Sequence, residues 1–208
     1  MAENQLGFYF DANLCTGCKA CQVACKDKWD LEVGISWRRV AEYSGGEWVR
    51  NPDGTYNQDV FSYYTSVACN HCDNPVCANV CPANAITQRE DGIVLIDEDK
   101  CIGCRYCEWA CPYGAPQFDE ASGIMTKCNF CYDAIDVGEK PTCVTACPHR
   151  ALDFGTLAEL REKYGDVVTE VAPLPEASIT EPAMVIKPHR HAKAVGSSAG
   201  QLANPKEM

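Results

Sequence analysis

Short apolar runs separated by polar turns predict strands of only a few residues. Phe8–Asp11 predicts one such strand, and Ala151–Gly155 predicts another much later in the chain. Between them, Ala85–Thr87 and Ile93–Ile96 lie on either side of a turn at Asp91-Gly92, which is typical of a β-hairpin. Each of these strands leads into, or follows, one of the cysteine runs described below.

Three other segments have patterns of their own. Leu157–Tyr164 predicts a short helix with its charged side chains outward, and a helical turn is expected within Tyr132–Thr142. Residues 26–65 lack cysteine and are rich in aromatic side chains, and Asn51–Gly54 predicts a turn between strand-like flanks. We therefore expect a hairpin-bearing insertion that packs over the binding sites or against a partner. Ordinary core packing is the alternative role for its aromatic side chains.

The composition changes from about residue 166. Residues 172–208 contain five prolines, no cysteine and no helical period. Such a segment is either a disordered tail or an extended arm that lies on a partner subunit. The apolar run Pro182–Pro188 favours the arm, because a solvated tail has little use for it.

Cysteine accounts for 16 of the 208 residues, and a four-member run recurs four times. Residues 101–112 read Cys-x2-Cys-x2-Cys-x3-Cys-Pro, the run that holds iron–sulfur clusters in bacterial ferredoxins. Three thiolates sit on one tight loop, whereas the fourth points away and completes a neighbouring cluster. The first run has the same spacing, with Lys26 in place of the proline, whereas the second and fourth runs have second gaps of four and eleven residues. The runs are Cys15, Cys18, Cys21 and Cys25; Cys69, Cys72, Cys77 and Cys81; Cys101, Cys104, Cys107 and Cys111; and Cys128, Cys131, Cys143 and Cys147.

The runs must pair, because each fourth cysteine belongs to the cluster of a neighbouring run. The second and third runs pair because a short hairpin joins them, and the first and fourth pair by elimination. Exchanging the fourth cysteines uses all sixteen thiols in four 4Fe–4S clusters. The expected ligand sets are Cys69, Cys72, Cys77 with Cys111; Cys101, Cys104, Cys107 with Cys81; Cys15, Cys18, Cys21 with Cys147; and Cys128, Cys131, Cys143 with Cys25.

This pairing predicts an α+β fold in which one ferredoxin-like 4Fe–4S module is nested inside another. Residues 66–120 would form the inner two-cluster module. Residues 1–65 and 121–165 would form the outer module, with the aromatic hairpin inserted at about residues 26–65. Residues 166–208 would form an extended C-terminal arm.

Zinc and disulfides are the alternatives for so many cysteines. Structural zinc sites use two separated Cys-x2-Cys pairs, which suits only the run at residues 128–147, and only when it is read alone. Disulfides do not suit two-residue spacing in four runs, and residues 1–10 show no secretory signal. We therefore expect a soluble protein made in a reducing compartment, whose thiols are ligands.

The net charge of the protein limits the classes of partner that it can bind. The formal net charge of −11 excludes nucleic acid, which would need a basic face. No stretch approaches the roughly 18 apolar residues of a membrane span. Lys19, Arg105 and Lys127 lie beside ligand positions, where a cation either raises a cluster's potential or is an ordinary exposed charge. His71, between two ligand positions, is expected to tune a cluster or to face solvent, and no residue is expected to be catalytic.

Several segments resemble the iron–sulfur subunit, or B subunit, of anaerobic dimethyl sulfoxide reductase. They are Cys-Thr-Gly-Cys-Lys-Ala-Cys, Cys-Asn-His-Cys, Arg-Glu-Asp-Gly, Cys-Ile-Gly-Cys-Arg-Tyr-Cys, Ala-Cys-Pro-Tyr-Gly-Ala-Pro-Gln, Met-Thr-Lys-Cys and the terminal Leu-Ala-Asn-Pro-Lys-Glu. The resemblance runs from about residue 6 to the end of the chain. The four-run pattern alone is shared more widely, with subunits of nitrate, formate, polysulfide and tetrathionate enzymes.

The resemblance implies a non-catalytic electron-transfer subunit of a heterotrimer in anaerobic respiration. A molybdopterin catalytic subunit would reduce dimethyl sulfoxide and other sulfoxides or N-oxides, and an integral membrane subunit would oxidise menaquinol. By analogy, electrons would enter at the cluster of Cys81, Cys101, Cys104 and Cys107 and leave from that of Cys15, Cys18, Cys21 and Cys147. Nitrate reductase relatives have Trp at one ligand position of the third run and a 3Fe–4S cluster there. Cys104 therefore implies four complete 4Fe–4S clusters.

Location and substrate stay open at this stage. The protein would be a peripheral membrane-associated subunit, on either the cytoplasmic or the periplasmic face, with no transmembrane segment of its own. The same relay would also serve a selenate, thiosulfate or tetrathionate reductase, because the catalytic partner selects the substrate. A free soluble polyferredoxin is the alternative from a different class.

Overall fold

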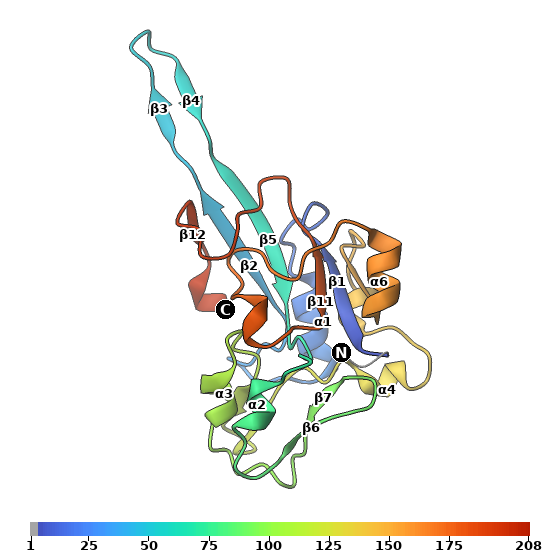
Figure 1. Cartoon of the computed structure of the whole chain (residues 1–208). Helices are drawn as coiled ribbons and strands as arrows, with labels where there is room; N and C mark the ends of the chain where they lie inside the picture. Colours follow the sequence, from blue (N-terminus) through green and yellow to red (C-terminus); the bar gives the residue numbers. More distant parts are fainter. Residues whose placement is uncertain (1–3) are drawn as a thin grey trace.

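The structure is a computed structural model that describes residues 4–208 and combines small β-sheets with short helices (Figure 1). This mixture confirms the α and β content that the sequence predicted. The strands are β1 (Leu6–Asp11), β2 (Arg39–Gly45), β3 (Trp48–Arg50), β4 (Tyr56–Gln58), β5 (Phe61–Val67), β6 (Ile86–Gln88), β7 (Val94–Ile96), β8 (Gln117–Asp119), β9 (Ile124–Thr126), β10 (Leu152–Thr156), β11 (Met184–Lys187) and β12 (Gly200–Leu202). The helices are α1 (Ala20–Lys28), α2 (Val76–Asn79), α3 (Tyr106–Ala110), α4 (Tyr132–Ile135), α5 (Thr142–Thr145) and α6 (Leu157–Tyr164), with two 3-10 helices, η1 (Ala177–Ile179) and η2 (Pro205–Glu207).

Strand β1 is the centre of a three-stranded sheet that joins distant parts of the chain. It pairs antiparallel with β10, with Phe8 opposite Phe154, and parallel with β11, with Phe10 opposite Ile186. The strand is buried over nearly its whole length, as its continuous apolar run requires. Because β1 precedes the first cysteine run and β10 follows the last, their pairing brings these two runs together.

A long hairpin built from two sheets projects from the body of the molecule (Figure 1). Strands β2 and β5 form its base, and β3 and β4 carry it to a tip that turns at Asn51–Gly54, where the sequence predicted a turn. Gly54 has φ +87°, a left-handed conformation that glycine adopts without strain. Tyr63 near the base is buried, whereas Trp48 and Tyr56 near the tip are 66% and 58% exposed. The aromatic side chains of this region therefore include both core residues and surface residues.

Two short hairpins flank the third cysteine run. The hairpin of β6 and β7 places Ile86 opposite Ile96 and turns at Asp91-Gly92, as predicted. The hairpin of β8 and β9 was not predicted, because two strands of three residues give almost no periodic pattern. The Asp119 carboxylate begins its turn by accepting a hydrogen bond from the backbone N–H of Ala121 at 3.0 Å.

Helix α6 occupies the residues that the sequence predicted and begins at a capping box. The Thr156 hydroxyl accepts a hydrogen bond from the Glu159 N–H at 3.3 Å, and the Glu159 carboxylate accepts one from the Thr156 N–H at 3.1 Å. Leu157 and Leu160 face the core, and Gly165 ends the helix with φ 66°. The predicted helical turn after the second cysteine of the last run is α4.

Residues 166–208 run back over the protein's own sheets. They supply β11 beside β1 and β12 beside β2. Asn204 anchors the end of the segment, because its amide donates to the Val40 carbonyl at 2.9 Å and its side-chain oxygen accepts from the Glu42 N–H at 2.8 Å. The composition left two alternatives for this segment, a disordered tail or an arm on a partner. In the structure the segment has short strands and makes contacts with the rest of the same chain.

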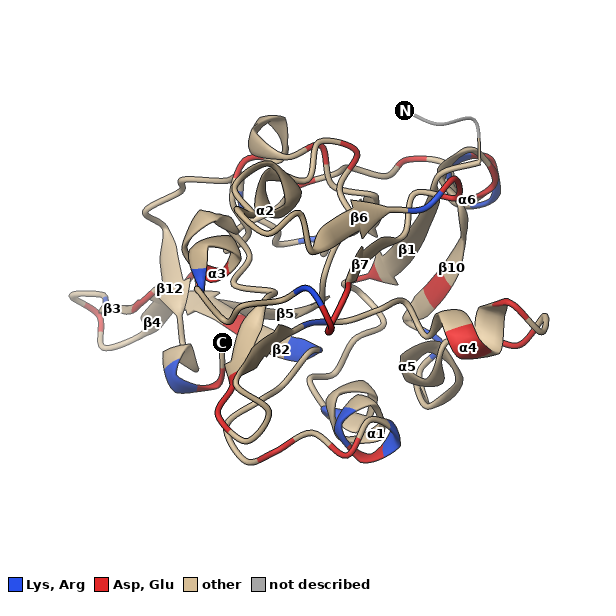
Figure 2. Ribbon diagram, turned by 90° about the horizontal axis from the view of Figure 1, so that it is seen from below, with Lys and Arg blue, Asp and Glu red and all other residues tan. Residues whose placement is uncertain are grey.

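Charges of both signs are interspersed along the ribbon (Figure 2). Helix α1 carries Lys26 and Lys28 around Asp27, and helix α6 also mixes acidic and basic side chains. Within residues 4–208, no helix combines the length and the apolar character that crossing a membrane requires.

Replacing Thr156 by alanine should weaken the start of α6. Loss of an N-cap hydroxyl costs about 1 kcal/mol, so amide hydrogens in the first two turns of α6 should exchange about fivefold faster under native conditions. Hydrogen exchange followed by mass spectrometry measures this directly. Glu162→Gln, on the outward face of the same helix, is the matched control and should leave exchange unchanged. Equal protection in the Thr156→Ala and unsubstituted proteins would contradict the role of the capping box.

Candidate metal centres

The sixteen thiols come together in four sets. The first, third and fourth sets each surround a small cavity. These are the groupings expected from the sequence, and all sixteen cysteines are free of disulfides. The first set is Cys15, Cys18, Cys21 and Cys147; the second is Cys25, Cys128, Cys131 and Cys143; the third is Cys69, Cys72, Cys77 and Cys111; and the fourth is Cys81, Cys101, Cys104 and Cys107.

The second set is the most deeply enclosed. All four of its thiols are buried. Cys25 interacts electrostatically with Cys131 and Cys143, and Cys128 with Cys25 and Cys143. In the first, third and fourth sets, the thiols line a cavity and do not converge on one atom position. Within residues 4–208, no group of three or more His, Cys, Asp or Glu side chains is arranged to hold a single metal ion.

Two loops with the same backbone conformation carry the first and third runs. Gly17 and Gly103 have φ 71° and 65°, and Lys19 and Arg105, two residues later, have φ 60° and 65°. A Cβ atom on Gly17 would lie 2.4 Å from the ring of Tyr64, so both the space and the conformation require glycine there. The repeated conformation aims the three thiols of each loop at one cavity.

Helix α1 connects the first set to the second. Cys21 and Cys25 are four residues apart on this helix and both are buried, so they lie on one face, one turn apart. Cys21 belongs to the first set and Cys25 to the second. One short helix therefore fixes the separation of two sets.

Backbone N–H groups point at several of the sulfur atoms. Ala151 N–H donates to Cys147 Sγ at 3.3 Å, and Ala85 N–H donates to Cys81 Sγ at 3.3 Å. In both cases the donor lies four residues after the last cysteine of a run. Similar bonds reach Cys101 and Cys128. Such bonds stabilise a thiolate relative to a thiol.

Burial has the opposite effect on the same thiols. It raises the pKa of Cys15 to about 11 and the pKa of Cys25, Cys72 and Cys77 to about 12. A metal that binds these sulfur atoms must therefore displace a proton from each thiol at neutral pH. The buried pockets are stable with anionic sulfur only when positive charge is present.

Three buried cations lie among the thiols. Arg38, Lys127 and Arg39 are 2%, 4% and 7% exposed, and none of them forms an ion pair with a carboxylate in the described part of the chain. Lys127 donates to the carbonyls of Val94 and Cys128. Arg39 donates to the Tyr113 carbonyl at 2.6 Å. A buried charge without a counter-charge is costly, so these side chains suit pockets that hold anionic sulfur.

Only one of the three cations named from the sequence is buried. Lys19 forms an ion pair with Glu207, and Arg105 pairs with Glu108 at 2.7 Å on the surface. Lys127 is the buried one. Sequence reasoning missed Arg38 and Arg39, because they lie outside the cysteine runs. The one available signal was a pair of arginines at the start of an apolar strand.

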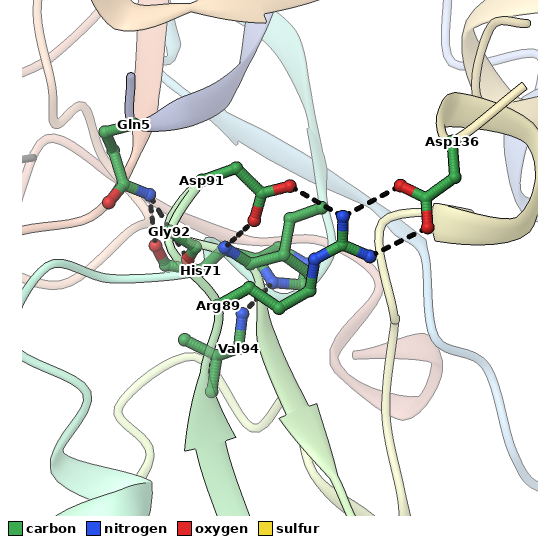
Figure 3. Close-up of polar contacts among 8 residues, drawn as sticks. Gln5, His71, Arg89, Asp91, Gly92, Val94 and Asp136 are labelled. Carbon is green, nitrogen blue, oxygen red and sulfur yellow. Dashed lines mark hydrogen bonds and ion pairs between the residues drawn. The ribbon is translucent and has the colours of Figure 1, made fainter. Parts of the chain in front are cut away.

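His71 is wholly buried, so solvent exposure, one of the two roles expected for it, is wrong. Figure 3 shows its ring accepting a hydrogen bond at Nδ1 from the Val94 N–H, 3.0 Å away. Its carbonyl accepts from Gln5 Nε2 at 3.0 Å. Burial, and then the charge of Lys127, lowers the pKa of His71 well below its usual value, so the ring is neutral at pH 7. The residue ties the first strand to the β6–β7 hairpin.

An ion pair beside His71 links the same hairpin to the last cysteine run. The Arg89 guanidinium donates to both carboxylate oxygens of Asp136, at 2.8 and 3.0 Å, and also pairs with Asp91 at 3.0 Å (Figure 3). Asp136 follows α4, which begins directly after Cys131. This bidentate contact therefore joins the hairpin between the second and third runs to the fourth run.

The four sets form a line. Electrostatic interactions between neighbouring thiols link Cys21 of the first set with Cys143 of the second, and Cys128 of the second with Cys69 of the third. Cys77 of the third set interacts with Cys107 of the fourth. The sets therefore follow one another in the order first, second, third and fourth.

Known proteins match this sequence over most of its length. The sequence pattern of a 4Fe-4S dicluster domain matches residues 60–157, and that of a 4Fe-4S binding domain matches residues 12–29. The B subunit of anaerobic dimethyl sulfoxide reductase from Escherichia coli (strain K12) is 55% identical over 204 residues, which cover 98% of each protein. The B subunit of polysulfide reductase from Wolinella succinogenes is 38% identical over 191 residues, covering 88% of the present protein and 94% of the relative. The thiosulfate reductase electron transfer subunit PhsB of Salmonella typhi is 40% identical over 157 residues, covering 75% and 78%.

These matches confirm the resemblance seen in the sequence and the 4Fe–4S character of the cofactors. The cysteine-lined cavities, the N–H donors to sulfur and the buried cations all suit such clusters. Identity of this extent over nearly the whole length also establishes the family. The protein therefore belongs to the family of iron–sulfur, electron-transfer subunits represented by the B subunit of anaerobic dimethyl sulfoxide reductase.

Proposed function

We propose that this protein relays electrons through four 4Fe–4S clusters, from a quinol-oxidising membrane subunit to a molybdopterin subunit that reduces dimethyl sulfoxide and related sulfoxides or N-oxides. The observation that carries this proposal is the linear order of the four thiol sets. A line of redox centres has two separate ends, and it is useful only when the ends face different partners. A free polyferredoxin has no need of such an arrangement.

Each set would hold one cluster through its four thiolates. This assignment makes the third and fourth sets an inner module, residues 66–120, and the first and second sets an outer module, residues 1–65 and 121–165. The β6–β7 hairpin lies within the inner module, and the pairing of β1 with β10 supports the outer one. Residues 166–208 would serve as an arm that straps the modules together at β1 and β2.

A bound 4Fe–4S cluster accepts and releases one electron. The protein's own residues prepare its environment. Buried walls exclude water, and N–H donors such as that of Ala151 favour thiolate sulfur. The buried cations Arg38, Arg39 and Lys127 offset the negative charge that thiolates and clusters bring into the core.

The run that supplies Cys101, Cys104 and Cys107 of the fourth set also carries three exposed apolar side chains, Ile102, Tyr106 and Trp109, named here the apolar patch. These side chains are 67%, 51% and 74% exposed, and the rings of Tyr106 and Trp109 stack at 5.8 Å. Large exposed apolar side chains that cluster mark interaction sites. We propose that the membrane subunit docks on this patch and delivers electrons to the fourth set.

The first set is then the end that faces the catalytic subunit. Cys18 of this set is exposed, as an end of the line should be. The protein would be the peripheral middle subunit of a heterotrimer. Dimethyl sulfoxide is preferred as the partner's substrate because identity to the dimethyl sulfoxide reductase subunit is 55%. It is 38% and 40% to the polysulfide and thiosulfate reductase subunits.

Loss of an inner cluster should stop quinol-driven reduction of dimethyl sulfoxide but leave dye-driven reduction intact. Cys69→Ser removes a thiolate from the third set, so quinol-driven reduction of dimethyl sulfoxide by membranes should fall to background. Reduction driven by a small viologen dye, which delivers electrons to the catalytic subunit directly, should persist. Ser62→Ala, an exposed position on β5, is the control. Full quinol-driven activity in an assembled Cys69→Ser complex would contradict the relay. Equal rates with thiosulfate and dimethyl sulfoxide in the unsubstituted complex would favour thiosulfate as the alternative substrate.

Charge placed on the apolar patch should weaken docking. Trp109→Glu removes an aromatic anchor, which typically costs about 2 kcal/mol or more at an interface, or about 30-fold in affinity. The protein should therefore leave the membrane fraction while keeping its iron. Trp48→Glu, at the hairpin tip far from α3 (Figure 1), is the matched control for an exposed tryptophan. Release by Trp48→Glu and retention of Trp109→Glu would place the docking face at the hairpin instead.

A further inference from the structure

We propose that Arg38 sets the reduction potentials of the two clusters held by the first and second sets, raising both through one fixed positive charge between them. The inference rests on the proposed function, because it concerns the clusters that these sets would bind. Arg38 lies outside every cysteine run, yet it would influence the reduction potentials of two of the four clusters.

Arg38 is held rigidly on the side of the first set. Its Nη1 donates to the hydroxyl of Ser66 at 3.1 Å and approaches the Ser66 carbonyl at 3.4 Å. That hydroxyl in turn lies 3.4 Å from Cys21 Sγ. The guanidinium also lies over the ring of Phe8, 4.6 Å from its centroid. These contacts leave the side chain little freedom to move away from the sulfur atoms.

The same guanidinium also faces the second set. Its side chain hydrogen-bonds with the Cys143 thiol, and the Arg38 backbone N–H hydrogen-bonds with the Cys25 thiol, so Arg38 lies against two members of this set. Its Nη2 is buried and has no oxygen or nitrogen acceptor within residues 4–208. A buried N–H donor without an acceptor is costly, so its presence points to an acceptor that the protein itself does not provide. The sulfide of a bound cluster supplies such an acceptor.

The positive charge of Arg38 determines the direction in which the reduction potentials shift. Reduction adds one electron to a cluster, and a nearby cation stabilises the reduced form more than the oxidised form. The interaction is strong because Arg38 is 2% exposed and little water screens it. No carboxylate within residues 4–208 pairs with Arg38, so its charge is not neutralised locally. The guanidinium also stays protonated at every accessible pH.

The test is an EPR-monitored redox titration of the membrane-bound complex. In Arg38→Gln, the midpoint potentials of two of the four clusters should move to lower values while the other two stay in place. In Arg38→Lys, which keeps the charge, both should stay close to those of the unsubstituted complex. Arg39→Gln is the matched control: Arg39 is the next residue and is also buried, but its guanidinium bonds the carbonyls of Tyr113 and Gly114 beside Cys111 of the third set. It should leave the potentials of the first and second clusters unchanged.

Several results would overturn the proposal. They are unmoved potentials in Arg38→Gln, an equal shift of all four clusters, or the same shift in Arg38→Lys, which would indicate packing instead of charge. If Arg38→Gln does not assemble, Ser66→Ala takes its place, because it removes the anchor that holds the guanidinium against Cys21. Lower potentials for the same two clusters would support the proposal, and unchanged ones would overturn it. Fewer than four clusters in the unsubstituted complex would instead refute the relay on which the inference rests.

Discussion

The pairing of β1 with β10 is the constraint on which the rest of the structure depends. It joins residues near the start of the chain to residues beyond the last cysteine run, and β11 then adds to the free edge of β1. Without it, Cys147 would not reach Cys15, Cys18 and Cys21, and Cys25 would not reach the second set. The sheet converts four runs that are spread along the sequence into one line of sites.

Charge in the core is balanced between buried thiols and buried cations. Sixteen thiols are packed close together, many of them buried, and burial raises the pKa of thiols in all four sets. Arg38, Arg39 and Lys127 are buried in the same region without carboxylate partners. Neither the cations nor the thiolates are stable there alone. Cluster binding and folding are therefore expected to be coupled in this protein, as in other small metal-binding folds.

Sequence reasoning succeeded where chemistry repeats at a fixed spacing. Three of the expected cysteine sets line cavities in the structure, the assignment of all sixteen thiols as cluster ligands stays a prediction, and the sequence also placed β1, the β6–β7 hairpin and α6. It missed α1, whose apolar pattern is carried by cysteines, and β8 and β9, which are three residues each. It also missed Arg38, because nothing local marks a residue that becomes important only when β2 lies beside two distant cysteine sets. Contacts of this kind depend on tertiary structure and leave no periodic trace.

We propose that four clusters occupy the four thiol sets. Iron and acid-labile sulfide should be measured per molecule on protein purified without oxygen, together with its EPR spectrum during stepwise reduction. Four 4Fe–4S clusters predict about 16 iron and about 16 sulfide per molecule, with signals from neighbouring reduced clusters that interact. Zinc in place of iron, or iron sufficient for only one or two clusters, would contradict this claim.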